Sequence, residues 1–197
     1  MDTMSAEGDR EQQLLPAAER LICESRTLNL SLGEVAEHVG VSRSLLYVYF
    51  EGVPAIIDAL FAKHLGRLGA QILPNLDAAE QPFCERAAAA YAGYLEYLIE
   101  SGPILQLILR ERHQDSPLGF ESKRHFLHLV RRVAKQTCEA LSLTPREAFV
   151  LIEITSGIPE ALARLVRDDE IDRATAHATC QRLIAASVGG FAPAVPN

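Results

Sequence analysis

The sequence contains no tryptophan, only two methionines and comparatively little basic charge. Its 197 residues include 19 lysines and arginines against 26 aspartates and glutamates, which gives a formal net charge of −7. An acidic chain is not built as a general binder of polyanions, so any contact with nucleic acid must be local and geometrically focused. The composition also lacks the biases typical of disordered, collagen-like or disulfide-rich chains, and the length is sufficient for one or two globular cores.

Long apolar runs are missing as well. Charged residues such as Glu96 and Glu153 interrupt the most hydrophobic stretches, so no window reaches the ~18 apolar residues of a membrane helix. The polar start, MDTMSAEGDREQQ, has neither the basic nor the apolar part of a secretory signal. We therefore expect a cytoplasmic protein that does not span a membrane.

Motifs for metal binding and catalysis are absent too. The four cysteines stand singly at positions 23, 84, 138 and 180, which favours reduced, buried thiols over a disulfide framework or a zinc site. His125 and His128 are three residues apart, but no cysteine or well-spaced carboxylate completes a metal site. The sequence has no nucleophile elbow, no phosphate-binding glycine loop and no HExxH motif. We predict no metal, no cofactor and no enzyme activity.

Apolar residues at helical spacing are abundant, and no strand-type alternation is sustained, so the pattern predicts an all-α fold. Prolines, glycines and capping residues separate nine expected helices. Pro16 is expected in the opening turn of the first helix, Pro74 at the end of the fourth, and Pro159 at a kink in the eighth or near a break at Gly157. The expected helices are at about 14–25, 32–39, 43–50, 54–73, 82–101, 103–113, 117–141, 145–167 and 169–187.

The segment SLGEVAEHVGVSRSLLYVYF, residues 31–50, has the most informative spacing. Ser31 and Glu34 are spaced as a capping box, which starts a helix. Gly40 can adopt the left-handed conformation that a sharp turn needs, and Ser42 can cap the next helix. A helix, a tight glycine turn and a second helix form the arrangement that braces one helix in a DNA major groove.

The second helix of this segment has two different sides. Arg43 and Tyr47 are four residues apart and therefore project from one side. The opposite side can pack on the preceding helices through Val41, Leu46 and Phe50.

Together with a helix that begins near Pro54, this segment resembles the DNA-binding region of the tetracycline-repressor (TetR) family over roughly residues 10–65. The apolar-alanine pair Val35-Ala36, the Gly-Val-Ser run at 40–42 and the terminal Tyr47 and Phe50 carry the resemblance. It implies a nine-helix homodimer that represses transcription from a palindromic operator. Three N-terminal helices would bind the DNA, and a C-terminal bundle would hold a small-molecule effector and dimerise through the last two long helices.

The resemblance also implies functional domains and DNA contacts. The helix-turn-helix domain would comprise residues 10–53, a connecting helix 54–73, and the ligand-binding and dimerisation domain 74–190. Arg43 and Ser44 would face base edges, and Tyr47 would lie between base and phosphate. The full set of expected DNA-binding residues is Ser31, Ser42, Arg43, Ser44, Tyr47 and Tyr49.

Several positions depart from the family pattern. Val53, with Glu51 close by, stands where many members have a phosphate-binding lysine, Leu45 replaces a small or hydroxyl residue, and Arg26 replaces a helix-ending glycine. Residues 10–64 contain five basic and seven acidic side chains, a net charge of −2. These features motivate an alternative interpretation, a TetR-like interaction protein with weak or lost DNA binding. A carrier or enzyme built on the C-terminal bundle is a second alternative.

The expected effector site centres on tyrosines that recur every third residue, Tyr91, Tyr94 and Tyr97. They could line an apolar cavity with hydroxyls that orient a ligand, or they could simply pack in the core. Glu153, within an apolar run, could pair with a cationic ligand or with an arginine across a helix interface. The other expected lining residues are Leu98, Leu105, Ile108, Phe126, Val130, Phe149 and Ile152.

A basic stretch on the seventh expected helix contains Lys123, Arg124, Arg131, Arg132 and Lys135. Such a stretch is most simply a solvated helix face, and the alternative is a site for an anionic ligand or partner.

Overall fold

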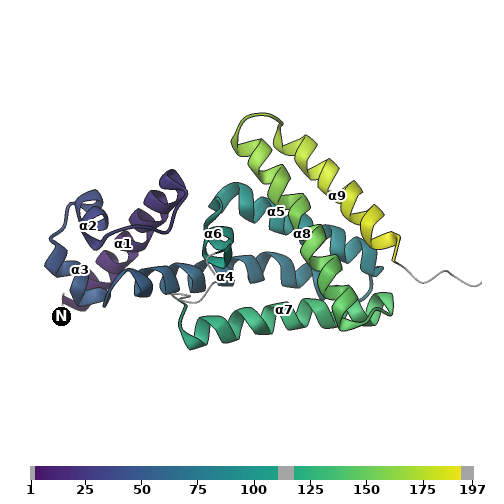
Figure 1. Ribbon diagram of the computed structural model, residues 1–197, viewed down its shortest axis with the longest axis horizontal. Helices are drawn as coiled ribbons and strands as arrows, with labels where there is room; N and C mark the ends of the chain where they lie inside the picture. The colour runs from purple at the N-terminus through teal and green to yellow at the C-terminus, as the bar shows by residue number, and fades with distance from the viewer. Residues whose placement is uncertain (1–2, 111–117, 192–197) are drawn as a thin grey trace, which may run out of the picture. The chain divides into compact units, whose positions relative to one another are not determined.

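The computed structural model describes residues 3–110 and 118–191, and all regular secondary structure in those ranges is helical (Figure 1). This confirms the predicted all-α fold. The helices are α1 (Thr3–Ser25), α2 (Leu32–Val39), α3 (Arg43–Tyr49), α4 (Val53–Leu76), α5 (Phe83–Ser101), α6 (Ile104–Arg110), α7 (Phe120–Leu141), α8 (Pro145–Arg167) and α9 (Arg173–Gly189). The expected end of the sixth helix at 113 and the expected start of the seventh at 117 lie outside the described residues.

Two expectations about prolines were wrong, and for Pro159 the structure excludes one of the two alternatives, the break near Gly157. The first helix begins at Thr3, so Pro16 lies in its interior rather than in its opening turn. The fourth helix continues through Pro74 to Leu76, and α8 continues through Pro159 without a break at Gly157. A proline removes one backbone hydrogen bond from a helix, and tertiary packing can outweigh that loss: Pro159 is buried against neighbouring helices.

The start of α9 also differs from the expectation. The expected first residue, Asp169, has a φ of 56° and therefore lies in the left-handed region, which ends a helix rather than starting one. The cap is Asp172, whose side chain accepts a hydrogen bond of 2.6 Å from the Thr175 amide.

The chain forms two compact units, which we call the N-terminal unit (residues 1–65 and 103–124) and the C-terminal unit (66–102 and 125–197). Both α4 and α7 supply residues to each unit. The functional domain boundaries expected at 53 and 74 do not coincide with this division and stay predictions.

The N-terminal unit is built around α1, α2, α3 and the first part of α4. Its core contains Ala17, Ile22, Val35, Leu46 and Phe61, all of which are buried. Glu19 connects α1 to α4, because it pairs with Lys63 at 2.8 Å and contacts His64 at 3.3 Å. In the same unit the Gly119 amide, one residue before α7, donates a 2.7 Å hydrogen bond to Asp58 of α4.

Burial of Glu19 would by itself raise the pKa of its carboxyl group. Hydrogen bonds and charges from His64 and Lys63 outweigh this effect and lower the pKa to about 2. The carboxylate is therefore ionised at every pH at which the protein is expected to work.

The C-terminal unit is centred on α5, which packs along α8 and α9. Figure 1 shows α8 and α9 side by side and running in opposite directions. The core of this unit includes Leu95, Tyr97, Leu98, Ala163 and Ile184, all buried.

Polar contacts also hold the helices of the C-terminal unit together. Arg167 of α8 donates a 2.9 Å hydrogen bond to the Leu98 carbonyl. Glu96 of α5 accepts from Arg173 of α9 at 2.8 Å and contacts His177 at 2.7 Å.

No single helix in the described part of the chain is long and apolar enough to cross a membrane. The one helix pair that reaches that length and composition together, α3 with α4, is bent by 55° at its break.

The cysteines are all free thiols, but only Cys180 is buried, while Cys23, Cys84 and Cys138 are half-buried. Burial raises the pKa of the Cys180 thiol to about 11. Within the described residues, no three histidine, cysteine or carboxylate side chains are grouped as metal ligands.

Candidate nucleic-acid interface and ligand pocket

The expected capping box at the start of α2 is present. The Glu34 amide donates to the Ser31 hydroxyl at 3.2 Å, and the Ser31 amide donates to the Glu34 carboxylate at 2.7 Å. These hydrogen bonds from Ser31 lower the pKa of Glu34. They fix the first residue of α2 and therefore the position at which the helix ends and the turn begins.

The turn between α2 and α3 depends on Gly40, which has a φ of 74° and a ψ of 31°. No heavy atom lies within 4 Å of the position that a β-carbon would occupy there. Glycine is therefore required by backbone conformation and not by a lack of space. The turn is closed by the Val41 amide, which donates to the Ala36 carbonyl at 3.0 Å.

The third helix is anchored on one side and open on the other. Ser42 caps it by accepting from the Leu45 amide at 3.3 Å, and Leu46 and Phe50 are buried against the rest of the N-terminal unit. Arg43 and Ser44 are exposed. The open side therefore carries a cation and a hydroxyl, the donors and acceptors that read DNA base edges and phosphates.

Two large side chains complete the open side. Tyr47 is 52% exposed, and the Arg43 guanidinium carbon lies 5.9 Å from the centroid of its ring, which is within the range of a cation–π contact. Val48, beside Tyr47, is 72% exposed. We define the outer face of α3 as Arg43, Ser44, Tyr47 and Val48.

The remaining expected DNA-binding residues lie around this face. Ser31 and Ser42 are exposed, but both hydroxyls already accept a helix-capping hydrogen bond. Each hydroxyl still has a proton to donate, for example to a phosphate. Tyr49 is half-buried. Sequence reasoning missed Val48, although its spacing of four from Ser44 was the signal that would have placed it on the open side.

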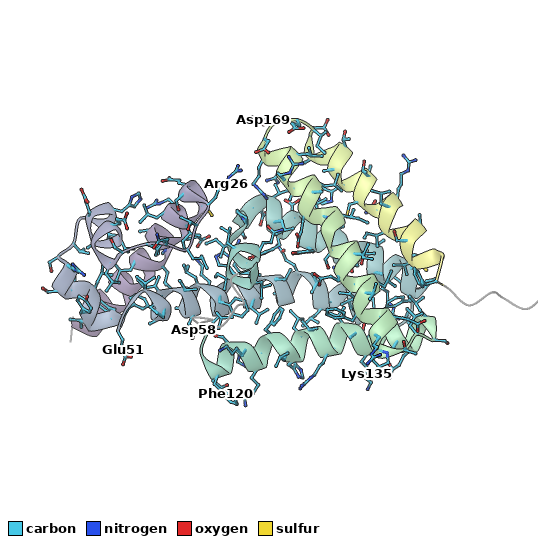
Figure 2. The ribbon with its side chains drawn as sticks, viewed as in Figure 1. Arg26, Glu51, Asp58, Phe120, Lys135 and Asp169 are labelled. Atoms are coloured by element: carbon cyan, nitrogen blue, oxygen red, sulfur yellow. The ribbon has the colours of Figure 1, made fainter. Side chains whose placement is uncertain are left out.

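The charge around this face is modest. Glu51 follows α3 and is exposed (Figure 2), and Val53 is half-buried at the start of α4. Lys63, the basic residue of α4 in this unit, is engaged by Glu19.

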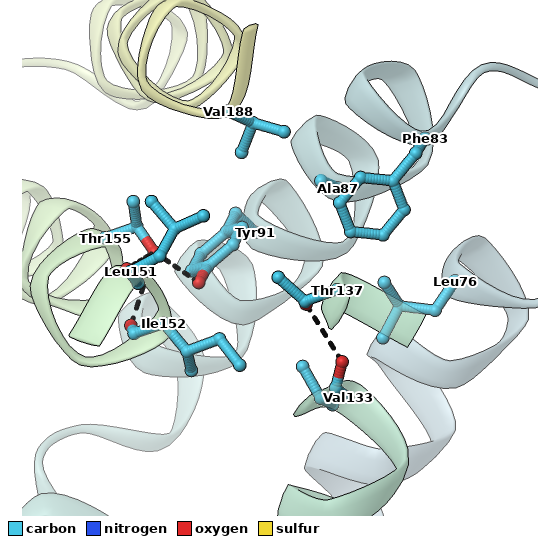
Figure 3. A pocket seen from close by; sticks show the side chains of 10 residues that line it. All are labelled: Leu76, Phe83, Ala87, Tyr91, Val133, Thr137, Leu151, Ile152, Thr155 and Val188. Carbon is cyan, nitrogen blue, oxygen red and sulfur yellow. Dashed lines mark hydrogen bonds between the residues drawn. The ribbon is translucent and has the colours of Figure 1, made fainter. Parts of the chain in front are cut away.

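A small pocket lies in the C-terminal unit, where α5, α7, α8 and α9 meet the end of α4 (Figure 3). Its volume is about 20 Å³, which is room for a water molecule and not for a drug-sized ligand. No charged side chain is among the described residues that line it. The lining residues are Leu76, Phe83, Ala87, Tyr91, Val133, Thr137, Leu151, Ile152, Thr155 and Val188.

The polar atoms of the pocket are hydroxyl oxygens. The Tyr91 and Thr155 hydroxyls are 2.5 Å apart, and the Thr155 hydroxyl donates to the Leu151 carbonyl at 2.6 Å. Burial raises the pKa of Tyr91. The Thr137 hydroxyl donates to the Val133 carbonyl at 2.9 Å. The pocket suits an uncharged, mostly apolar molecule.

Of the expected lining residues, Tyr91 and Ile152 line this pocket. Tyr94 instead donates a hydrogen bond to Glu160 at 3.1 Å, and burial, with the charge of Glu160, raises its pKa. Tyr97 and Leu98 are buried in the core of the C-terminal unit, and Leu105 and Ile108 are buried in the N-terminal unit.

The other expected lining residues lie on the long helices. Phe126 and Val130 are half-buried on α7. Phe149 is 55% exposed, and Glu153 is exposed one turn further along α8. The lining residues contributed by α4 and α9, Leu76 and Val188, were missed because periodicity identifies a buried face but not which buried faces leave a gap.

The basic residues of α7 are all exposed, and Figure 2 labels Lys135 among them. Three have acidic partners: Arg124 contacts Glu121, Arg132 contacts Asp77, and Lys135 contacts Glu139 at 3.8 Å. Exposed pairs of this kind are typical of a solvated helix face.

Comparison with solved structures identifies the fold. A TetR-like transcriptional regulator from Rhodococcus superposes with a TM-score of 0.69 at 21% identity, covering 92% of this chain and 96% of the other. A TetR family transcription regulator from Marinobacter aquaeolei superposes with a TM-score of 0.71 at 14% identity, covering 94% and 98%. The chain has the TetR-family fold.

Comparison with curated sequences agrees with the TetR fold. Uncharacterized HTH-type transcriptional regulators from two strains of Mycobacterium tuberculosis are each 31% identical over 70 residues, 36% of this chain. That match spans about a third of the relatives' own length, 35%. No protein-family model matches the chain. The matched proteins from Rhodococcus, Marinobacter and Mycobacterium are named as transcriptional regulators.

Proposed function

We propose that this protein is a transcriptional regulator that binds a palindromic operator in double-stranded DNA as a homodimer and acts as a repressor in the cytoplasm. The observation that carries the proposal is the outer face of α3, which is held by a helix-turn-helix and exposes Arg43, Ser44 and Tyr47 together. A lone exposed arginine would be ordinary. An arginine, a hydroxyl and a tyrosine on the open side of a second helix are the donors and acceptors of base readout.

Homodimerisation is supported by apolar residues left exposed on the two last helices. Ile154 is 69% exposed on α8, where Phe149 and Val150 are also exposed, and Leu183 is exposed on α9. Apolar groups of this kind mark an interaction surface, and a twofold contact would bury the same residues on both subunits. Ile154→Glu should therefore give monomers in light scattering, and Lys135→Glu, exposed on α7, should leave the dimer intact.

A dimer is needed for the proposed DNA binding, because two recognition helices must reach half-sites about one helical turn, ~34 Å, apart. An effector would act by favouring a conformation in which this spacing is lost. The C-terminal pocket holds only about 20 Å³, so a bound effector must displace its walls. Those walls include Leu76 of α4 and Val133 of α7, and both helices also supply residues to the N-terminal unit.

The lining residues indicate the chemistry of the effector. It would be uncharged and mostly apolar, with one group that hydrogen-bonds the Tyr91 or Thr155 hydroxyl, because a charge would be buried without a partner. Ala87→Leu should fill the pocket. The Ala87→Leu variant should still bind the operator. If straight-chain alcohols release DNA from the parent protein, they should no longer release it from this variant. Continued release of DNA from the variant would place the effector elsewhere.

DNA binding itself is tested by recovering genomic fragments with the full-length protein. Arg43→Ala and Tyr47→Ala should each lose most of the enrichment of specific fragments. Arg131→Ala, which removes an equally exposed positive charge from α7, should not. If all three variants recover the same fragments as the parent, the alternative is supported: a TetR-like interaction protein with weak or lost DNA binding. The net charge of −2 over residues 10–64 also favours this alternative.

Salt dependence gives a second measurement. The slope of log affinity against log salt follows the number of neutralised phosphates. Because few free basic groups lie beside α3, we expect a shallow slope of log affinity against log salt. We expect specificity to depend on the spacing of the two recognition helices in the dimer. A slope as steep as that of a strongly basic DNA-binding protein would contradict this expectation.

A further inference from the structure

The outer face of α3 includes a strongly exposed apolar side chain. Val48 is 72% exposed, more than the neighbouring Tyr47 at 52%. Its backbone lies in a short helix whose other side is fixed by the buried Leu46 and Phe50. The valine is therefore held outward by the packing of its neighbours.

Helical geometry places Val48 on the same side of α3 as Ser44 and Tyr47. At about 100° per residue these three residues fall within about 100° of one another, opposite Leu46, with Val48 and Arg43 at the two edges of the outer face. Val48 also follows Ser44 by one turn, as Tyr47 follows Arg43. A helix laid into a groove by this face would bring both methyl groups of Val48 against base edges.

Single exposed apolar residues are common on proteins and need no explanation by themselves. Val48 differs because the three other members of its face are polar or amphipathic and carry the proposed recognition. In the major groove of DNA, thymine alone presents a methyl group, and apolar side chains recognise it by contact. A valine side chain, which has no donor or acceptor, can contribute to base selection only through such a contact.

We propose that Val48 is a specificity-determining residue that selects thymine through contact with its C5 methyl group. This inference rests on the proposed function, because it requires that α3 enters the major groove. Arg43 would read a guanine through its O6 and N7 atoms. Five residues of helix separate Arg43 from Val48, a rise of about 7.5 Å, so the selected thymine would lie within about three base pairs of that guanine.

The experiment starts from the full-length protein and a pool of randomised DNA duplexes, from which bound sequences are enriched. In the enriched duplex, each thymine is then replaced by deoxyuridine, which removes only the methyl group. One thymine per half-site should be sensitive, with a loss of roughly fourfold per half-site and on the order of tenfold when both are replaced. Replacement of the other thymines should change affinity less.

Three variants distinguish the contact from a general effect. Val48→Ala should bind the thymine and deoxyuridine duplexes with nearly equal affinity, and Val48→Thr, which keeps one methyl group, should retain part of the preference. Leu127→Ala removes an exposed apolar side chain from α7 and should keep the full preference. Because Val48 is exposed, these substitutions should not unfold the protein, and a thermal melt of each variant checks this.

Each outcome is decisive. A methyl preference that is present in the parent and absent in Val48→Ala supports the inference. The inference is overturned if the enriched duplex has no methyl-sensitive thymine. It is also overturned if Val48→Ala keeps the methyl preference. In both cases the proposed function stays in place. If no duplex is enriched at all, the proposed function fails, and the inference fails with it.

Discussion

The Arg43 guanidinium lies over the ring of Tyr47, one helical turn away, with 5.9 Å between the guanidinium carbon and the ring centroid. Both side chains are exposed, and neither contributes to the buried core. The contact limits the rotamers of a long, flexible side chain and keeps its charge on the outer face of α3. Part of the ordering that DNA binding would require is therefore already present in the free protein.

This relationship predicts the effect of Arg43→Lys, a substitution that keeps the positive charge. Lysine cannot make the planar, bidentate contact of arginine with a guanine edge. We expect a loss of about 1–3 kcal/mol in discrimination for the preferred base, together with an unchanged salt slope and an unchanged melting temperature. Affinity measured on the enriched duplex and on a single-base variant of it checks this, and full retention of discrimination would show that Arg43 contacts phosphate only.

Gly40 should be the most sensitive position of the turn. Its φ of 74° is strained for any residue with a β-carbon, even though the surrounding space is open. We expect Gly40→Ala to destabilise the protein by about 1–2 kcal/mol. Gly66→Ala is a matched control, because Gly66 lies inside α4 with no atom close to a new β-carbon, and it should stabilise the protein by up to about 1 kcal/mol. Urea unfolding measures both, and equal effects of the two substitutions would contradict this account.

The Glu19 cluster predicts a pH-dependent contribution to stability. The folded-state pKa of about 2 lies below the ordinary glutamate value of 4.5, so the ionised carboxylate stabilises the folded state. This contribution is complete above about pH 4.5 and is lost as the pH falls towards 2. Because Glu19 retains some contact with solvent, we expect Glu19→Gln to cost only about 1 kcal/mol at neutral pH.

The measurement compares the free energy of unfolding of the parent and Glu19→Gln at neutral pH and at successive values below 4.5. The difference in unfolding free energy between the parent and Glu19→Gln should become smaller as the pH falls below 4.5. Glu24→Gln, an exposed position on the same helix, should give a small difference that does not narrow. A gap between parent and Glu19→Gln that is constant with pH would show that the ion pairs with Lys63 and His64 do not stabilise the fold.

Features determined by neighbouring residues could be predicted from the sequence. The capping box of Ser31 and Glu34, the left-handed Gly40 and the cap at Ser42 each depend on backbone groups within five residues, so local spacing was sufficient. The same local reasoning failed at Pro16 and Pro74, which lie inside α1 and α4 rather than at a helix end.

Long-range features of the candidate site could be predicted only in part. The spacing of Tyr91 and Tyr97 was consistent with cavity lining or with core packing, and it could not show that Tyr91 borders a gap while Tyr97 is enclosed. That distinction depends on how α7, α8 and α9 close around α5. Val48 was missed for a different reason, since an apolar residue in a short helix is ordinarily assigned to the core.

The hydroxyl pair in the pocket predicts unequal effects for its two members. The Thr155 hydroxyl donates its only proton to the Leu151 carbonyl, so the 2.5 Å contact with Tyr91 is one in which the tyrosine donates. Tyr91→Phe removes that donor and leaves Thr155 bonded to Leu151, which should cost about 1 kcal/mol. Thr155→Val removes two hydrogen bonds, to Leu151 and to Tyr91, and leaves Ser156 as the remaining side-chain partner of the Tyr91 hydroxyl; it should cost more, about 2 kcal/mol.

The two substitutions together should therefore cost less than the sum of the single effects, because the hydrogen bond between the two hydroxyls can be lost only once. Unfolding in urea at one fixed protein concentration measures the three variants and the parent, which keeps dimerisation from altering the comparison. Tyr94→Phe, which loses a hydrogen bond to Glu160 outside the pocket, is the control and should add to Thr155→Val independently. If the changes in unfolding free energy of Tyr91→Phe and Thr155→Val add to within about 0.5 kcal/mol, the two hydroxyls are not coupled. They would then not act together in binding the polar group of an effector.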